Sequence, residues 1–237
     1  LAPTSKTYTI IQNDEILDIG DQLSEGRLVA LGAYGRPTGS RVYAAWELGE
    51  GMSIAGDPYR NFVTIINTHD RNGTWGQMAP IRLGCTNQGN ATFGRRATPR
   101  FVIRHVGEPK LKLEEARRIL GLSRQYLDAF AEGMEDLLAR PMGTDRFVAY
   151  ERQVFGVLNF EDLKPRQQQI VKVRDEQLLE ILASQTNEWG RGTAAAGYNA
   201  VVEHLDFFAP AAGKTDAAKA ASRQMRIVTG ATDKVKN

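Results

Sequence analysis

The hydrophobic pattern of this chain changes its period near Lys110, and that change constrains the fold more than any other feature. Before it, short apolar runs rich in β-branched and aromatic residues alternate with turn-forming sequences, which is typical of strands. After it, apolar residues recur at helical spacing over long stretches. Strands followed by helices predict an α+β fold with an antiparallel sheet, because a parallel sheet would need the two to alternate.

Six segments of the N-terminal half are predicted to be extended: Thr7–Gln12, Arg27–Tyr34, Arg41–Leu48, Phe62–Thr68, Trp75–Cys85 and Arg100–Val106. Turn-forming sequences such as G-R-P-T-G-S and D-R-N-G-T separate several of them. After the first segment, Asn13 is expected to cap a short helix. The apolar side chains of that helix fall on one side: Ile16, Leu17, Ile19 and Leu23.

A long helix over Lys110–Arg140 is predicted to pack against a curved sheet, and Pro141 ends its periodicity. Further helices are predicted over Arg166–Ser184 and Thr193–Phe208. The first of these has an apolar stripe of Ile170, Val173, Leu178, Ile181 and Leu182. We divide the chain into a sheet with its long helix (1–140), a helical region packing on it (141–208) and a low-complexity tail (209–237), in which Ala217–Val228 can form one more helix.

Composition excludes several classes of protein. With 42% hydrophobic and 24% charged residues, the 237-residue chain resembles an ordinary globular protein. Its single cysteine, Cys85, excludes an intrachain disulfide framework and a multi-cysteine zinc site. No run approaches eighteen apolar residues, so no membrane-spanning helix is expected. The chain begins at Leu1 without a charged-then-apolar signal peptide, and we therefore expect a cytoplasmic protein.

Charge is segregated along the chain, although the net charge is only +2. Residues 81–127 carry ten basic and three acidic side chains, whereas residues 128–190 carry seven and twelve. A concentrated basic segment favours an anionic partner. The alternative interpretation is a solvated basic face that the acidic helices balance in space.

The basic segment has the composition of a nucleic-acid-binding surface. Arginine side chains bind phosphates, and phenylalanine rings stack on unpaired bases. Asparagine adds neutral donors and acceptors. The residues predicted to bind nucleic acid are Arg82, Arg95, Arg96, Arg100, Arg104, Phe93, Asn87 and Asn90. Phe101, in the run Phe101-Val102-Ile103, is better explained as a core residue.

Signals for catalysis are weak. The histidines at 69, 105 and 204 are scattered without ligand spacing, so no zinc site is predicted. Cys85 is expected to be a buried structural thiol, since a nucleophile needs a nearby base. The glycines at 32, 35 and 39 lack the ending of a phosphate-binding loop and fit a hairpin turn. We therefore expect no metal, no cofactor and no enzyme activity.

A set of landmarks occurs in order along most of the chain. It includes Y-T-I-I-Q-N (Tyr8–Asn13), I-A-G-D-P-Y (Ile54–Tyr59), I-I-N-T-H-D (Ile65–Asp70) and G-T-A-A-A-G-Y-N-A-V-V-E-H-L-D (Gly192–Asp206). This order resembles the phage- and plasmid-like family of domains of unknown function that is common in actinobacterial phages and mobile elements. At His69-Asp70-Arg71 the chain departs from the usual pattern, in which a glycine follows the aspartate.

The resemblance implies no established activity. Its association with phage genomes, and a layout similar to phage single-strand annealing proteins, imply a role in recombination in the host cytoplasm. The function expected is a single-stranded DNA-binding and strand-annealing protein that acts as a homo-oligomer, either a ring or a filament. Two alternatives stay open: a phage structural or protein-interaction (anti-defence) factor, and a nucleic-acid-processing enzyme with His69, Asp70 and Cys85 in one cleft.

Overall fold

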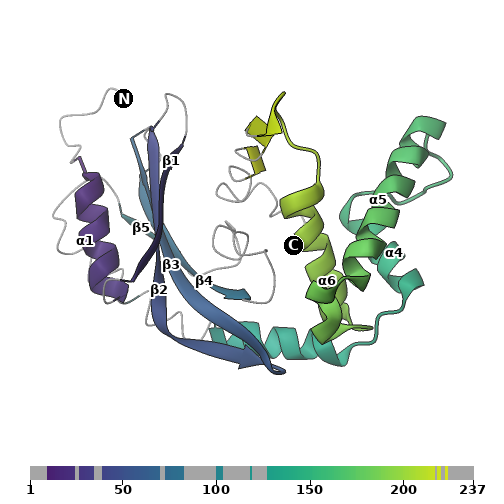
Figure 1. The fold of residues 1–237 in the computed structure, drawn as a ribbon, viewed down its shortest axis with the longest axis horizontal. Coiled ribbons are helices and arrows are strands. Elements are labelled where there is room, and N and C mark those ends of the chain that lie inside the picture. The colour runs from purple at the N-terminus through teal and green to yellow at the C-terminus, as the bar shows by residue number, and fades with distance from the viewer. Residues whose placement is uncertain are drawn as a thin grey trace.

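The computed structural model describes residues 10–24, 27–34, 39–69, 73–82, 100–103, 118, 127–216, 218–219 and 222–223. An antiparallel sheet forms the N-terminal half and helices follow it, so the predicted α+β class is confirmed. Figure 1 shows helix α1 on one side of the sheet and the C-terminal helices on the other side. None of the helices in the described residues combines the length and apolar character needed to cross a bilayer.

The sheet is a five-stranded meander in the order β1-β2-β3-β4-β5. Its strands are β1 (Leu28–Tyr34), β2 (Arg41–Ile54), β3 (Asp57–Thr68), β4 (Thr74–Arg82) and β5 (Arg100–Ile103). Each strand pairs antiparallel with the next one along the chain. Strands β2 and β3 are the longest, and their hairpin curves toward the helical half (Figure 1).

Helix α1 (Asn13–Ser24) covers one face of the sheet, as its apolar spacing predicts. Ile16 and Ile19 pack with residues of β2 and β3 that share this face, including Trp46, Val63 and Ile65. The Trp46 indole donates from Nε1 to Asp21 Oδ1 at 2.7 Å, which fixes the ring on the helix. Fully buried aromatic and β-branched side chains form this core.

The strand predicted over Thr7–Gln12 is wrong for the part that the structure describes. Residues 10–12 lie outside any strand, and Thr7–Thr9 lie outside the described residues. The Ile11 carbonyl accepts a hydrogen bond from Asn67 Nδ2 at 3.0 Å, and the same amide donates to Asn13 Oδ1 at 2.9 Å. A side-chain amide therefore joins this segment to β3 in place of a ladder.

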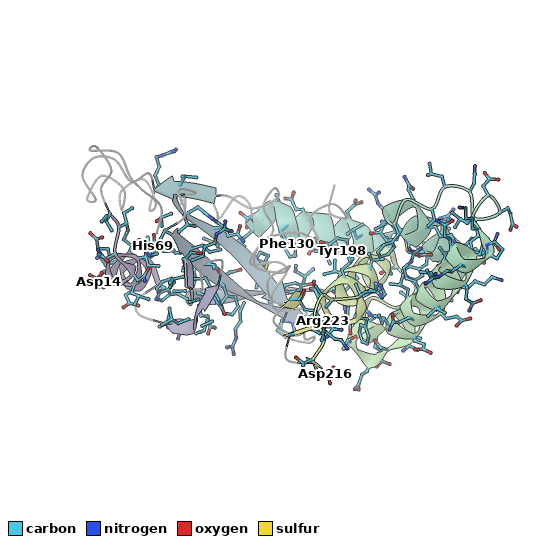
Figure 2. All side chains as sticks on the ribbon, turned by 90° about the horizontal axis from the view of Figure 1, so that it is seen from above. Asp14, His69, Phe130, Tyr198, Asp216 and Arg223 are labelled. Carbon is cyan, nitrogen blue, oxygen red and sulfur yellow. The ribbon has the colours of Figure 1, made fainter. Side chains whose placement is uncertain are left out.

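The tip of the β2–β3 hairpin connects the sheet to the helices. Ile54 and Tyr59 form a buried cluster with Met134, on the helix over residues 127–139, and with Ala195. The rings of Tyr59 and Phe130 meet edge to face with centroids 5.7 Å apart. The described part of the predicted helix Lys110–Arg140 thus packs on this tip, while α1 covers the sheet's face (Figure 2 labels Phe130 at the junction).

The helical half has its own core. It comprises α4 (Thr144–Val154), α5 (Pro165–Ala183), a 3-10 helix η1 (Gln185–Gly190) and α6 (Ala194–Glu203), which continues as a π-helix η2 (His204–Phe208). The apolar residues buried between them are Phe147, Leu178, Ile181, Ala200 and Val201. Of the tail helix predicted over Ala217–Val228, residues 218–219 and 222–223 are helical and the others lie outside the described residues.

The apolar stripe predicted for α5 is wrong at its N-terminal end. Ile170 and Val173 are 61% and 53% exposed, and Val171 is buried instead. Asp175, one turn after Val171, shares the buried side because Arg152 of α4 binds it. An internal ion pair therefore shifts the buried face of the helix away from its most apolar stripe.

Candidate nucleic-acid interface

Two of the predicted binding residues lie on adjacent strands. Arg82 ends β4 and pairs with Tyr59 of β3, while Arg100 begins β5 and pairs with Gln77 of β4. Five residues separate Gln77 from Arg82, so the two positions are roughly 17 Å apart along the strand direction. The other predicted residues lie outside the described ones: Arg95, Arg96, Arg104, Phe93, Asn87 and Asn90.

This strand order fixes the attachment of the basic segment. Residues 83–99 leave the sheet at the end of β4 and return at the start of β5, the next strand of the meander. Both ends of the stretch that carries Arg95 and Arg96 are thus attached to neighbouring strands at one side of the sheet. A segment whose two ends are held by the fold binds a ligand at a lower entropic cost than the same segment with free ends.

An open hollow of about 620 Å³ lies beside the end of β4. Residues of β2 and β3 line it together with Arg27, which precedes β1, and two of its side chains are basic, Arg27 and Arg60. Tyr59 also lines the hollow and pairs with Arg82 across the β3–β4 ladder. The hollow and the start of the basic segment are therefore adjacent on the sheet.

Glycines shape the floor of the hollow. The β2–β3 register shifts between Leu48 and Met52, where Gly49 and Gly51 lie. A Cβ atom on Gly51 would lie 2.4 Å from the Tyr59 carbonyl oxygen, so a side chain there cannot be accommodated without backbone movement. Gly49 has open space around its Cα. Strand glycines of this kind permit close approach of a ligand to the backbone.

The charge of the hollow is partly balanced within the protein. Arg60 Nη1 lies 3.3 Å from Glu47 Oε1, and the Arg60 side chain is half exposed. The Glu47 backbone amide donates to the Arg27 carbonyl at 2.9 Å, which joins the residue before β1 to β2. Glu47 is only 17% exposed, so Arg60 is the partner that solvent reaches. A ligand phosphate can therefore approach Arg60 from the solvent side of this pair.

Arg27 and Arg60 were not among the residues predicted from the sequence. They are 33 positions apart and lie outside the basic segment, and only the pairing of β1, β2 and β3 brings them to one hollow. Neither has an arginine neighbour in the sequence that would have signalled a basic patch. A count of charge along the sequence therefore cannot identify Arg27 and Arg60 as neighbours, because strand pairing brings them together.

His69, a candidate for catalysis, lies in a structural cluster at the start of α1. Its Nε2 is 3.2 Å from Asn13 Oδ1, beside the Asn67 amide that holds the Ile11 carbonyl. Figure 2 places it on the α1 side of the molecule, away from the helical half. Asp70 and Cys85 lie outside the described residues, so their distance to His69 is not tested. No metal-binding group of three His, Cys, Asp or Glu side chains occurs within the described segments.

A charged cluster lies inside the helical half. Arg174 Nη2 is 3.1 Å from Glu151 Oε2, and Arg152 Nη2 is 2.8 Å from Asp175 Oδ2. Burial, a hydrogen bond with Asp175 and the charge of Asp175 raise the pKa of Glu151 to about 8, against the lowering effect of the two arginines. The Glu151 side chain is fully buried. This cluster therefore joins α4 to α5 through largely buried charge pairs.

Comparison with known proteins identifies the family but no activity. No curated protein and no solved structure matches the chain. A family model described as a domain of unknown function (DUF932) matches residues 1–228. The chain therefore belongs to the DUF932 family of domains of unknown function.

Proposed function

We propose that this protein binds single-stranded DNA and anneals complementary strands as a homo-oligomer in phage-type recombination. The observation that carries the proposal is the position of the basic segment at the sheet. It begins at Arg82, whose β3 partner Tyr59 lines a hollow that contains Arg27 and Arg60. Arginines from distant parts of the sequence thereby adjoin the segment that has the highest positive charge.

The chemistry of these residues suits binding to a nucleic-acid backbone. Guanidinium groups bind phosphate oxygens through paired N–H donors, without reading base identity. An annealing protein must hold the backbone and leave base edges free to pair with a second strand. An open hollow lined by two arginines fits that division better than an enclosed pocket does. Annealing is energetically downhill, so the mechanism requires neither metal nor nucleotide.

Matched variants test whether DNA contacts the basic segment and the hollow. We expect Arg95→Ala/Arg96→Ala and Arg60→Ala each to weaken binding of a fluorescent oligo-dT on the order of tenfold, since each removes a charged hydrogen bond. Glu47→Gln should strengthen binding, because it removes the carboxylate that occupies Arg60. Fluorescence anisotropy at low salt gives the affinities, and Arg166→Ala, at an exposed position of α5, is the control.

Annealing itself needs a second measurement. The rate at which two complementary labelled oligonucleotides pair should rise with the wild-type protein and fall with the Arg95→Ala/Arg96→Ala variant. If oligo-dT affinity is unmeasurable at low salt, or if all variants bind as the wild type does, the proposal is wrong. If the protein binds oligo-dT but does not accelerate the pairing of complementary strands, annealing is excluded and protection of single strands remains as its function.

A second candidate function, a protein-interaction factor, is favoured by one observation. Large apolar side chains of the helical half are exposed: Leu158 is 84% exposed, and Ile170 and Val173, about one turn apart on α5, are 61% and 53% exposed. Exposed apolar surface on a helix is typical of contacts with other proteins. This function would be favoured if the protein bound no DNA but retained a host protein on a column, and if the Ile170→Lys/Val173→Lys variant lost that retention.

A further inference from the structure

Strand β1 is an edge of the sheet with an unusual surface. Among the described residues it pairs with β2 alone. Its side chains are nevertheless apolar and open to solvent: Leu28, Val29 and Leu31 are 43%, 51% and 56% exposed. Natural edge strands usually carry lysine, other charges or proline that prevent pairing with other chains. Strand β1 has none of these between Leu28 and Tyr34, and its register shift toward β2 lies between Leu28 and Ala30, which leaves Ala30–Tyr34 regular.

The exposed residues of β1 lie on both faces of the sheet. Leu31 pairs with Ala44 and therefore lies on the face that α1 covers. Ala30 pairs with Ala45 and lies on the opposite face, and it is exposed too. A helix or loop packed on the sheet would cover only one of these faces. A further strand in the plane of the sheet covers both, because its own side chains alternate between them.

We propose that β1 pairs antiparallel with β1 of a second copy of this chain, about a two-fold axis at Leu31. The partner strand must be apolar on both faces and uncharged over about seven residues, and β1 itself has these properties. In this register Leu31 faces Leu31 of the other copy, and Leu28 faces Tyr34. The two Arg27 side chains lie roughly 26 Å apart along the strands, so like charges do not meet.

This pairing rests on the self-association in the proposed function and names the surface that supplies it. It joins two meanders into one ten-stranded sheet, because each copy adds five strands. Strands β4 and β5, which flank residues 83–99 of the basic segment, lie at the opposite side of the sheet from β1 in each copy. The new interface therefore lies away from Arg82, where the basic segment begins, whereas Arg27, which lines the hollow, lies next to it.

Single-cysteine variants test the register. In a Cys85→Ser background, Leu31→Cys should form a disulfide-linked dimer under mild oxidation, since opposed Cα atoms in a ladder lie within disulfide reach. Ala33→Cys, on the same face, is the matched control. In this register Ala33 of one copy lies opposite Val29 of the other, four residues along the strand from the second Ala33. Val173→Cys controls for random collision, since it is equally exposed. Linkage of Ala33→Cys or Val173→Cys as readily as Leu31→Cys would overturn the proposal.

Solution mass gives an independent readout. The wild-type protein should have twice the chain mass in light scattering, and Leu31→Arg should halve it, whereas Val173→Arg should not. A monomeric wild type overturns the pairing, as does a mass that Leu31→Arg leaves unchanged. A disulfide that forms only between the Leu31→Cys and Val102→Cys variants would also overturn it, because that result would indicate pairing of β1 with β5. Oligo-dT binding in the same samples reports on the proposed function separately.

Discussion

The carboxyl group of Glu151 stays protonated far above the pH at which a glutamate ordinarily ionises. Burial is the main cause of its raised pKa, about 8 against an ordinary 4.5, and the neighbouring Asp175 adds to it. The folded protein thus holds this proton more tightly than the unfolded chain does. The resulting stabilisation is complete below about pH 4.5 and is lost as the pH rises through 8.

We therefore expect the free energy of unfolding to fall with rising pH between these values, by at most about 1.4 kcal/mol per pH unit. Glu151→Gln should remove most of this dependence, because an amide does not titrate. Urea denaturation at pH 5.5, 7 and 8.5 measures it, with Glu176→Gln, at an exposed position of α5, as the control. Equal slopes for wild type and Glu151→Gln would contradict this assignment.

Gly20 in α1 allows the closest contact between helix and sheet. A Cβ atom there would lie 2.1 Å from the Trp46 ring, which the Asp21 hydrogen bond holds in place. Gly20→Ala should destabilise the protein by about 1–3 kcal/mol despite the better helix propensity of alanine. Gly133→Ala, in a helix with open space at that position, should stabilise it by about 0.5–1 kcal/mol. Thermal unfolding of both variants gives the comparison, and a stabilising Gly20→Ala would contradict the packing.

At the scale of elements, the contact between the β2–β3 tip and the helix over 127–139 holds the two halves together. Met134 is buried there against Ile54 and Tyr59. Met134→Ala should cost about 2–4 kcal/mol through lost contacts and a residual cavity. Glu135→Ala, on the exposed side of the same helix, should change stability by less than about 0.5 kcal/mol. Chemical denaturation measures both, and equal effects would argue against a coupled junction.

The sequence predicts an element well where one periodicity dominates it. The strand predicted over Arg41–Leu48 forms the first part of β2, and Ile16 and Ile19 predicted the buried side of α1. Prediction failed where a polar group decides the structure. Asn67 replaces a strand ladder at Ile11, and the Arg152–Asp175 pair turns Ile170 outward. Such partners are distant in the sequence and leave no local pattern.

The arginines of the candidate site likewise divide into those predicted from local sequence and those that only strand pairing brings together. Arg82 and Arg100 were predicted from local charge, and the structure places them on adjacent strands. Arg27 and Arg60 could not be predicted, because three paired strands bring them together. The ion pair of Arg60 with Glu47 also escapes a charge count, which records net charge but not which charges are neutralised.

For the whole molecule, the described acidic residues of the segment 128–190 divide into internally paired ones and exposed ones. Glu151 and Asp175 are paired internally, so part of the acidic segment is unavailable to a partner. Asp128, Glu132 and Glu135 are exposed on the helix over residues 127–139, away from its contact with the hairpin.

The central claim is that the basic segment holds the backbone of single-stranded DNA, and its salt dependence tests that claim most directly. If three to five arginines each neutralise one phosphate, log affinity for oligo-dT should fall with log salt with a slope of roughly −2 to −3.5. The Arg95→Ala/Arg96→Ala variant should have a shallower slope, by about 1.4. A slope near zero, or the same slope for both proteins, would contradict the account.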